Sequence, residues 1–445
     1  MSKISLFWFR RDLRLEDNRG LFAALKAGLP VLPIFIFDTI ILNKLSDKSD
    51  ARVSFIYNQV KSLKEKIEKL GGSFYVAYGN PVEIIDKITN ELPVKYLFTN
   101  KDYESYALQR DQAIKESLET KNIPFHLSKD HVIFEEREIL SKSAGTPYTV
   151  FTPYSKSWKE KLKSGLLEGE NSPLFTYDSE GLLHGNLYAN AAVPDFPTLD
   201  FMHFQPSKID IPSKDLNLKI VENYSENRDF PAKVGTSRLG IHLRFGTIGI
   251  RELARKIINL NETFLNELIW RDFYAQILFN FPHVEKNAFR SNYDLIKWRN
   301  NIDDFNRWTV GKTGFPLVDA GMRELNATGF MHNRVRMLTA SFLTKNLLID
   351  WRWGEKYFAE KLLDFDLASN NGGWQWAAGS GTDAAPYFRI FSPEAQMLKF
   401  DAQFQYIKKW VPEFGTPHYV KPMIDSKLSK DLCLAAYQLA LKSNP

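Results

Sequence analysis

Short apolar runs alternate with helical patterns along the first third of the chain. The apolar runs are bounded by turn-forming residues and cover 4–9, 31–37, 74–77 and 94–98. Between them, apolar residues recur at helical spacing near 18–28, 52–70, 81–89 and 103–120. Near-continuous apolar strands that alternate with helices are typical of a parallel sheet buried on both faces. We therefore predict a doubly wound, Rossmann-like α/β domain over residues 1–128.

The pattern changes in the rest of the chain. From 129 to 204 the periodicity fades while Gly, Pro, Ser and Asn accumulate, which predicts an ordered connector between two domains. From 205 to 445 strand patterns are absent, and helical patterns cover stretches such as 248–260, 265–279, 316–327 and 335–349. We predict that this part forms an all-helical C-terminal domain.

Composition agrees with two folded domains. The chain has 445 residues, which is long for one core, and its 44% hydrophobic and 25% charged residues are typical of a globular protein. The net charge of +5 is too small to establish nucleic-acid binding, although it allows a local basic face. Cys433 is the sole cysteine, which excludes an internal disulfide framework and indicates a reducing compartment. No segment approaches a signal peptide or a membrane span, so we predict a cytoplasmic protein.

Tryptophan is concentrated in the predicted helical domain. Eight of the ten tryptophans lie beyond residue 260, at positions 270, 298, 308, 351, 353, 374, 376 and 410. On composition alone, packing in a core explains these side chains best.

Two helical stretches carry polar and aromatic side chains on one face. Glu267, Trp270 and Arg271 follow the spacing i, i+3 and i+4 and therefore share a stripe. Such a stripe can be a surface ion pair beside a half-buried indole, or it can line a pocket that offers a hydrogen-bond acceptor and a stacking platform. Residues 333, 336 and 337 repeat the spacing, while residue 334 points elsewhere.

The densest group of chemically active side chains lies around the Gly372–Gly373 pair. It contains Asp364, Asp366, Asn370, Asn371, Trp374 and Trp376. A buried carboxylate is costly without a partner, and Arg336 is available for one of these two. Paired carboxylates occur in glycosidases, but nothing else in the chain supports sugar chemistry.

Several common kinds of chemistry lack their motifs. The chain has neither a GxGxxG dinucleotide fingerprint nor a GxSxG nucleophile elbow, and residues 311–316 lack the P-loop spacing. The eight histidines are scattered, so we predict no metal site. A cofactor that carries out the difficult step is the interpretation that remains.

The ordered motifs of the chain resemble those of the photolyase/cryptochrome family, and most closely those of class I cyclobutane pyrimidine dimer photolyases. The motifs share their order and spacing with that family and cover 8–18, 148–153, 235–239, 266–274, 311–316, 331–337, 364–376 and 381–387. The resemblance covers nearly the whole chain and implies a helical FAD-binding domain after the α/β domain.

The resemblance also implies how FAD, active in its reduced form FADH⁻, is bound. Tyr224, Thr236, Ser237 and Leu239 match the segment that holds the phosphates, where hydroxyls and backbone amides suit anionic oxygens. Arg336 and Asp364 match an ion pair over the flavin ring. The remaining cofactor positions are Arg271, Asp366 near the ring edge and ribose, and Asn370 facing flavin N5.

Two further sets of residues match functional positions of the family. The tryptophan chain that passes electrons inward matches Trp374, Trp351 and Trp298, while Trp308 and Trp353 stay structural. The residues that match contacts to a dimer flipped out of UV-damaged DNA are Glu267, Trp270, Trp376, Asn333 and Met337, with Arg228 and Arg334 on phosphates.

The implied activity is that of a deoxyribodipyrimidine photolyase, a carbon–carbon lyase in which blue light drives an electron from FADH⁻ to the dimer. A cryptochrome-type photoreceptor and a (6-4) photolyase are the alternatives. Asn370 favours repair over plant-type signalling, and Asn333, where the (6-4) branch carries His, favours the cyclobutane dimer. An ordinary flavin oxidoreductase needs a nicotinamide site, which the sequence does not show.

Three positions depart from the family pattern. Gly240 replaces a common Ser, Phe264 replaces a common Trp, and residues 103–107 lack the Asn–Glu pair of folate-antenna members. The second, antenna chromophore is therefore of unknown identity: a folate in an unusual pose, a deazaflavin, another flavin, or none. We expect a monomer that binds damaged DNA and no membrane.

Overall fold

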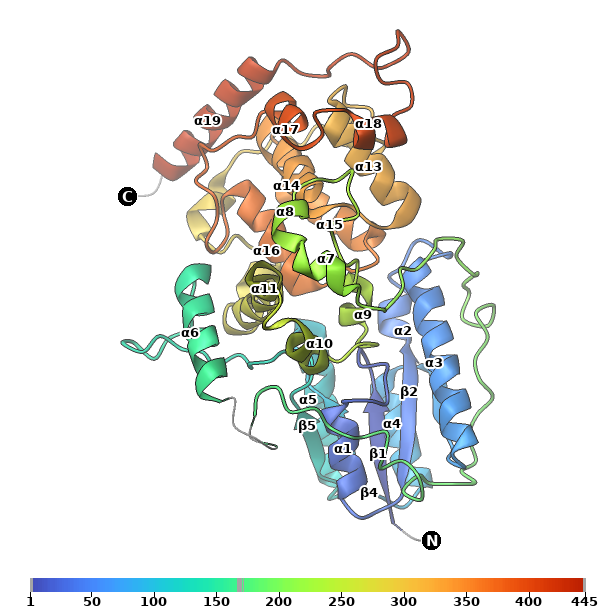
Figure 1. The fold of residues 1–445 in the computed structure, drawn as a ribbon. Helices are drawn as coiled ribbons and strands as arrows, with labels where there is room; N and C mark the ends of the chain where they lie inside the picture. Colours follow the sequence, from blue (N-terminus) through green and yellow to red (C-terminus); the bar gives the residue numbers. More distant parts are fainter. Residues whose placement is uncertain (1–2, 166–169, 171, 443–445) are drawn as a thin grey trace. The chain divides into compact units, whose positions relative to one another are not determined.

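The structure is a computed structural model that describes residues 3–165, 170 and 172–442 (Figure 1). The chain folds as two compact units, and it crosses between them more than once. The first unit comprises residues 1–138, 159–214 and 239–258, and the second comprises 139–158, 215–238 and 259–445. The boundaries predicted after residues 128 and 204 stay a prediction.

In the part of the chain that the structure describes, the first unit is built on a five-stranded parallel sheet. Its strands are β1 (Ile4–Phe9), β2 (Val31–Asp38), β3 (Tyr75–Gly79), β4 (Val94–Asn100) and β5 (Phe125–Ser128). Their order is β3-β2-β1-β4-β5, so the direction of winding reverses at β1. The predicted doubly wound α/β fold is confirmed.

Helices cover both faces of this sheet. The helices α1 (Arg19–Lys26) and α3 (Ala51–Lys69) pack with Phe7 and Phe9 of β1 on one face. The helices α4 (Pro81–Glu91) and α5 (Ser105–Thr120) pack with Leu6 and Trp8 on the other face. Successive side chains of a strand point to opposite faces, so a strand covered on both sides is apolar throughout. This burial explains the uninterrupted apolar runs.

The hydrophobic pattern misses three elements of the observed fold. The strand β5 lies at the edge of the sheet, and its partly exposed residues lack an apolar run. A short helix, α2 (Thr39–Leu42), follows β2 directly. The helix α6 (Phe151–Ser164) lies inside the predicted ordered connector, where no helix was predicted. Four lysines and three serines make this helix largely polar, and only a few apolar residues such as Tyr154 and Trp158 follow the helical period.

Helices account for the regular structure of the second unit, and no strand lies among its described residues. They are α7 (Leu218–Glu222), α8 (Tyr224–Asn227), α11 (Glu262–Asn280), η1 (Pro282–Glu285), η2 (Ser291–Leu295), α12 (Ile302–Thr309), α13 (Pro316–Thr328), α14 (Asn333–Ser341), η3 (Phe342–Asn346), α15 (Trp351–Lys361), α16 (Leu367–Ala378), α17 (Pro393–Phe400), α18 (Gln405–Trp410) and α19 (Ser426–Lys442). The helices α9 (Gly240–Arg244) and α10 (Ile250–Ile257) belong to the first unit. The prediction of a helical C-terminal domain is confirmed.

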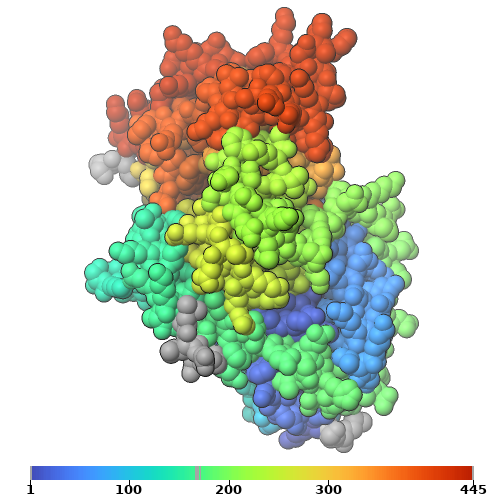
Figure 2. Space-filling view, in the orientation of Figure 1, coloured from blue at the N-terminus to red at the C-terminus, as the bar shows by residue number. Residues whose placement is uncertain are grey.

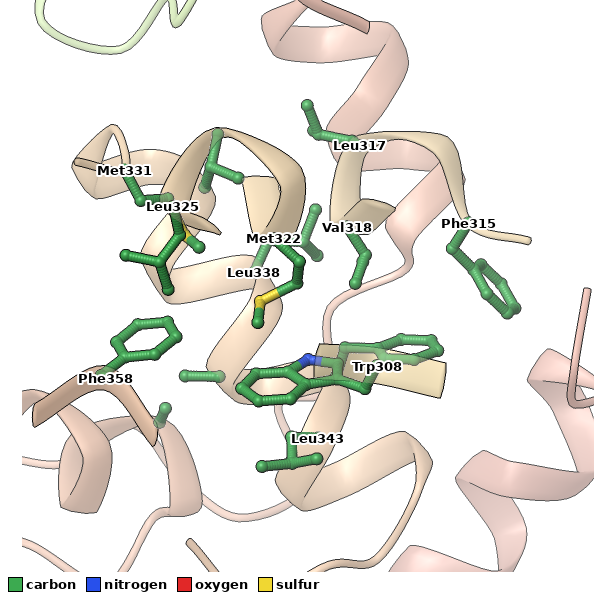
Figure 3. Packing of buried hydrophobic residues seen from close by; sticks show 14 of the residues in the cluster. Trp308, Phe315, Leu317, Val318, Met322, Leu325, Met331, Leu338, Leu343 and Phe358 are labelled. Atoms are coloured by element: carbon green, nitrogen blue, oxygen red, sulfur yellow. The ribbon is translucent and has the colours of Figure 1, made fainter. Parts of the chain in front are cut away.

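Trp308 lies at the centre of the core of the second unit (Figure 3). Its indole is fully buried, packs among Met322, Leu338 and Phe358, and donates from Nε1 to the Thr339 carbonyl at 3.2 Å. A buried indole whose N–H is satisfied contributes apolar burial without an unpaired donor. Trp308 is therefore the structural tryptophan that the sequence predicts. Across the described residues, no helix has the length and hydropathy to cross a bilayer.

Candidate functional site

The helix α11 presents the predicted stripe of Glu267, Trp270 and Arg271 on its half-buried side. Asn261 caps this helix by accepting from the Phe264 amide at 3.1 Å. The opposite side, which includes Leu268 and Ile269, is buried. Capping and burial thus fix the helix and leave the stripe facing a less crowded side.

Glu267 forms an ion pair with Arg228, which follows α8. Burial raises the pKa of Glu267, while Arg228 acts in the opposite direction. Burial and then the Glu267 carboxylate raise the pKa of Tyr224. Phe264, where the family often has Trp, packs edge-on against Tyr224 at 5.1 Å. Because Arg228 engages Glu267 here, its role on DNA phosphates stays a prediction.

Trp270 stacks face to face on Phe151, the first residue of α6. The ring centroids are 3.7 Å apart and the planes differ by 3°. Tyr274 lies beside Trp270, with centroids 5.3 Å apart and planes inclined by 31°. The indole remains only partly buried, so one of its faces is covered and part of it stays accessible.

The helix α14 carries Asn333 and Met337 on one face, with Asn333 Nδ2 at 3.9 Å from Met337 Sδ. Arg334 leaves that face: it pairs with Asp229 at 2.5 Å and lies over the Phe400 ring. This divergence follows the predicted spacing. The α7 and α8 segment that precedes Asp229 is exposed on the face shown in Figure 2.

His332 caps α14 from the inside of the unit. Its Nδ1 accepts from the Arg334 amide at 3.2 Å. Burial, followed by the charges of Arg336 and Arg334, lowers the pKa of His332 to about 4. The imidazole is therefore neutral near pH 7, which suits an N-cap acceptor.

Arg336 and Asp364 form the predicted ion pair, with a distance of 2.9 Å from Nη2 to Oδ2. Arg336 also donates from Nε to the Met331 carbonyl at 2.7 Å, which fixes the guanidinium. The second oxygen of Asp364, Oδ1, is buried and has no hydrogen-bond partner among the described residues. A buried carboxylate oxygen without a partner is costly, so this atom fits a donor on a bound group.

The helix α16 holds the next three predicted residues. Asp366 caps it by accepting from the Ser369 amide at 3.2 Å. One turn later, Asn370 donates from Nδ2 to the Glu355 side chain at 2.8 Å and to the Glu355 carbonyl at 3.1 Å. Burial raises the pKa of Glu355. Glu355 therefore orients the Asn370 amide, and Trp376, further along α16, is half-buried.

The three predicted electron carriers differ in exposure. Trp374 and Trp351 are each 2% exposed, whereas Trp298 is half-buried. In the described structure their rings make no contact with one another: Trp374 packs on Phe358 and Trp308, and Trp298 packs on Tyr437. Trp298 is thus the most exposed of the three, as expected for the surface end of the predicted chain.

The predicted phosphate segment is a turn that requires glycine. A Cβ on Gly235 would lie 2.7 Å from the Asn227 carbonyl, so a side chain cannot be accommodated there. The hydroxyls of Thr236 and Ser237, both half-buried, make no hydrogen bond within the described chain. Leu239 is buried and opens α9, which belongs to the first unit. Available hydroxyls in a tight turn fit anionic oxygens.

Sequence reasoning missed several residues that position this site. Phe151, Asp229 and Glu355 hold Trp270, Arg334 and Asn370 respectively. Phe151 lies within a motif that the sequence analysis singled out, and Asp229 directly follows Arg228. Nothing in the sequence pairs Glu355 with Asn370, since they lie on different helices. Over the described ranges, no group of three His, Cys, Asp or Glu side chains could hold a metal ion.

Comparisons with known proteins identify the family of the chain. Residues 264–416 match a model described as the FAD binding domain of DNA photolyase, and residues 5–173 match a DNA photolyase model. A deoxyribodipyrimidine photo-lyase from Alkalihalophilus pseudofirmus is 38% identical over 434 residues, covering 93% of this chain and 88% of the relative.

Two solved structures share the complete fold. A bacterial class III photolyase from Agrobacterium tumefaciens is similar with a TM-score of 0.85 and 32% identity, covering 100% of this chain and 98% of that one. An archaeal photolyase from Sulfolobus tokodaii with two FAD molecules is similar with a TM-score of 0.80 and 33% identity, covering 98% and 99%.

Proposed function

The chain belongs to the photolyase/cryptochrome family, and from this premise we propose how its residues act as a deoxyribodipyrimidine photo-lyase on UV-damaged DNA. The observation that carries the proposal is the stripe on α11, where the half-buried carboxyl of Glu267 lies one turn from the partly accessible indole of Trp270. A carboxyl and a stacking surface at this spacing match the needs of an extruded dimer of two neighbouring pyrimidines. The class I assignment stays a prediction.

The second unit binds FAD, and the bound reduced form supplies an electron under blue light. Tyr224, Thr236 and Ser237 hold the phosphates. The ion pair with Asp364 and the hydrogen bond to the Met331 carbonyl hold the guanidinium of Arg336 in place. Its positive charge therefore lies beside the Asp364 carboxylate, whose Oδ1 is buried. Asn370 presents a neutral amide whose orientation Glu355 sets, so no extra negative charge faces a reduced ring.

Glu267 hydrogen-bonds the dimer and stabilises the charge that arrives on it. Its raised pKa supports this role because a carboxyl that holds its proton more readily can donate a hydrogen bond. Trp270 and Trp376 stack on the two bases, and Asn333 and Met337 complete the contact surface. When DNA binds, Arg228 exchanges its ion pair with Glu267 for a DNA phosphate, and Arg334 exchanges its ion pair with Asp229 for another phosphate.

Trp374, Trp351 and Trp298 pass electrons from the surface inward when the enzyme needs reduction. The greater exposure of Trp298 compared with Trp351 and Trp374 supports its place at the surface end. Residues Leu239, Arg271 and Asp366 complete the proposed cofactor contacts.

The first unit carries a second chromophore that collects light. The carboxyl edge of a parallel sheet is where doubly wound folds bind ligands. At this edge the guanidinium groups of Arg10 and Arg110 lie 5.0 and 4.7 Å from the centroid of the Trp8 ring. The Tyr106 hydroxyl donates to Asp38 at 2.6 Å. Chromatography of the chromophores released from the purified protein distinguishes a folate, a deazaflavin, a flavin other than the catalytic FAD, and none.

The test of the proposed function is repair of thymine-dimer DNA by the chemically reduced protein in blue light and in darkness. Light-dependent restoration of intact thymines is the expected result. Repair of (6-4) DNA instead would assign the other repair branch, and bound FAD without any repair would favour a photoreceptor. We also propose that the protein is a monomer and lies in the cytoplasm. Size-exclusion chromatography with light scattering tests the oligomeric state.

A further inference from the structure

Phe151 stacks on one face of the Trp270 indole. With centroids 3.7 Å apart and planes within 3°, the two rings lie directly over each other. Aromatic pairs prefer offset or edge-to-face arrangements, because the like-charged faces of the two rings repel. The direct overlap therefore needs support from the surrounding structure.

That support comes from α6, which lies beside α11 (Figure 1). Tyr154 and Trp158 follow Phe151 at three and seven residues, on the same helix face. Tyr154 packs on Phe273 with centroids 5.2 Å apart, and Trp158 donates from Nε1 to Asp272 at 3.0 Å. Both side chains are at most 1% exposed, so α6 is fixed to α11 without Phe151.

The backbone just before Phe151 is held as well. The Gln276 side chain donates to the Tyr148 carbonyl at 2.8 Å, and the Thr382 hydroxyl donates to the Thr149 carbonyl. The Phe151 amide itself donates to Asp383 at 3.2 Å. These contacts, made from α11 and from the segment after α16, leave the Phe151 ring little freedom.

We propose that Phe151 is a positioning residue for substrate: it fixes the plane of Trp270 so that a flipped pyrimidine base stacks on the opposite indole face. The inference rests on the proposed function and deepens it. A ring fixed on one side gives the base a rigid platform and lowers the ordering cost of stacking. It also restricts the indole to a single stacking face.

The experiment compares Phe151→Ala, Phe151→Leu and Phe151→Tyr with the wild type, using the FAD-containing protein. Binding of thymine-dimer DNA and of undamaged DNA of the same sequence is measured together with FAD content. We expect Phe151→Ala and Phe151→Leu to bind dimer DNA about two- to tenfold more weakly, the range of an aromatic pair. Undamaged DNA should bind as in the wild type, and Phe151→Tyr should restore dimer binding.

A matched control is Phe414→Ala, which removes a half-buried phenylalanine that packs on Phe404 and Tyr419 in the same unit. It should leave dimer binding unchanged. In a Trp270→Ala background, Phe151→Ala should cause no further loss, because the two rings act as one platform.

Three results would overturn the inference: equal dimer binding by Phe151→Ala and the wild type, additive losses in the double variant, or loss of FAD from both Phe151→Ala and Phe151→Leu. The last result would make Phe151 a support of the fold. A wild type that does not prefer dimer DNA would instead overturn the proposed function, and the stacking role with it.

Discussion

At the residue scale, several predicted side chains of the site depend on a partner from another element. Glu267 and Trp270 share α11, but Arg228 pairs with the first and Phe151 stacks on the second. Helical spacing places neighbours three and four residues apart, whereas these partners are more than 35 residues away in the sequence. The stripe could thus be predicted, and its electrostatic and stacking environment could not.

Replacement of Glu267 by Ala should lower the repair yield by about ten- to hundredfold, because a hydrogen bond to a charged group contributes about 1.5–3 kcal/mol. FAD content should not change. Flash-induced repair of dimer DNA by the reduced enzyme measures the effect. Glu262→Ala, at the exposed start of the same helix, is the control and should repair normally. Unchanged repair in Glu267→Ala would remove the substrate assignment.

His332 makes the stability of the helical unit depend on pH. Its folded pKa of about 4 lies below the ordinary value of 6.5, so between these values the unfolded state binds more protons than the folded state. The free energy of unfolding should therefore rise as the pH rises from 4 to 6.5, by up to about 3 kcal/mol.

The His332→Asn variant keeps an N-cap acceptor and removes the titration. Denaturant unfolding of both proteins at pH 4.5 and 6.5, followed by fluorescence of the helical unit, checks the prediction. The variant should show a smaller rise, and the same rise in both proteins would assign the dependence to other groups.

At the element scale, two adjacent glycines of α16 have opposite surroundings. A Cβ on Gly372 would lie 2.2 Å from the Tyr274 ring of α11, while a Cβ on Gly373 would meet nothing within 4 Å. Gly372→Ala should therefore destabilise the unit by about 1–3 kcal/mol, because it overpacks the contact between two helices. Gly373→Ala should stabilise it by up to about 1 kcal/mol, because alanine favours the helix. Thermal unfolding of the two variants measures both effects. A similar change of stability in both would contradict the close approach of Gly372 to the Tyr274 ring.

The tryptophan chain spans several elements, from the segment after η2 through α15 to α16. Trp298→Phe should abolish photoreduction of oxidised FAD, because the partly exposed end of the chain is lost, and should leave repair by chemically reduced enzyme unchanged. Absorption spectroscopy under continuous blue light measures photoreduction of FAD, and an assay with dimer DNA measures repair by the chemically reduced enzyme. Trp353→Phe is the control with normal photoreduction. Equal loss of both activities in Trp298→Phe would contradict the chain.

At the scale of the whole chain, the first unit is closed by a buried ionic cluster of Arg14, Asp130 and Arg251. Asp130 accepts from Arg14 at 2.8 Å and from Arg251 at 2.7 Å, and the three side chains are at most 4% exposed. Burial alone raises the pKa of Asp130, but the two guanidinium groups together hold it well below the ordinary value. The cluster ties α10 to the loop after β1 across more than 200 residues.

Asp130→Asn should destabilise the first unit by about 3–5 kcal/mol, because it removes the carboxylate that two buried guanidinium groups share and leaves Arg251 with Asp17 alone. Glu252→Gln, which breaks an exposed pair with Lys256 on the same α10, should change stability by less than about 1 kcal/mol. Unfolding monitored by limited proteolysis of the full chain compares them. A neutral Asp130→Asn would show that the cluster does not hold α10 in place.

The sequence by itself determined the properties that depend on local spacing and composition. Uninterrupted apolar runs in the strands and the period of 3.6 in the helices specified the α/β class, the helical C-terminal part and the residues that share a helix face. At β5 and α6, exposed polar residues made the hydrophobic pattern weaker. Only the tertiary structure decided which distant segments meet: residues 239–258 with the sheet, Phe151 with Trp270, and Glu355 with Asn370. These pairings arise from close packing and from the cost of burying polar groups without partners, and neither leaves a periodic trace in the sequence.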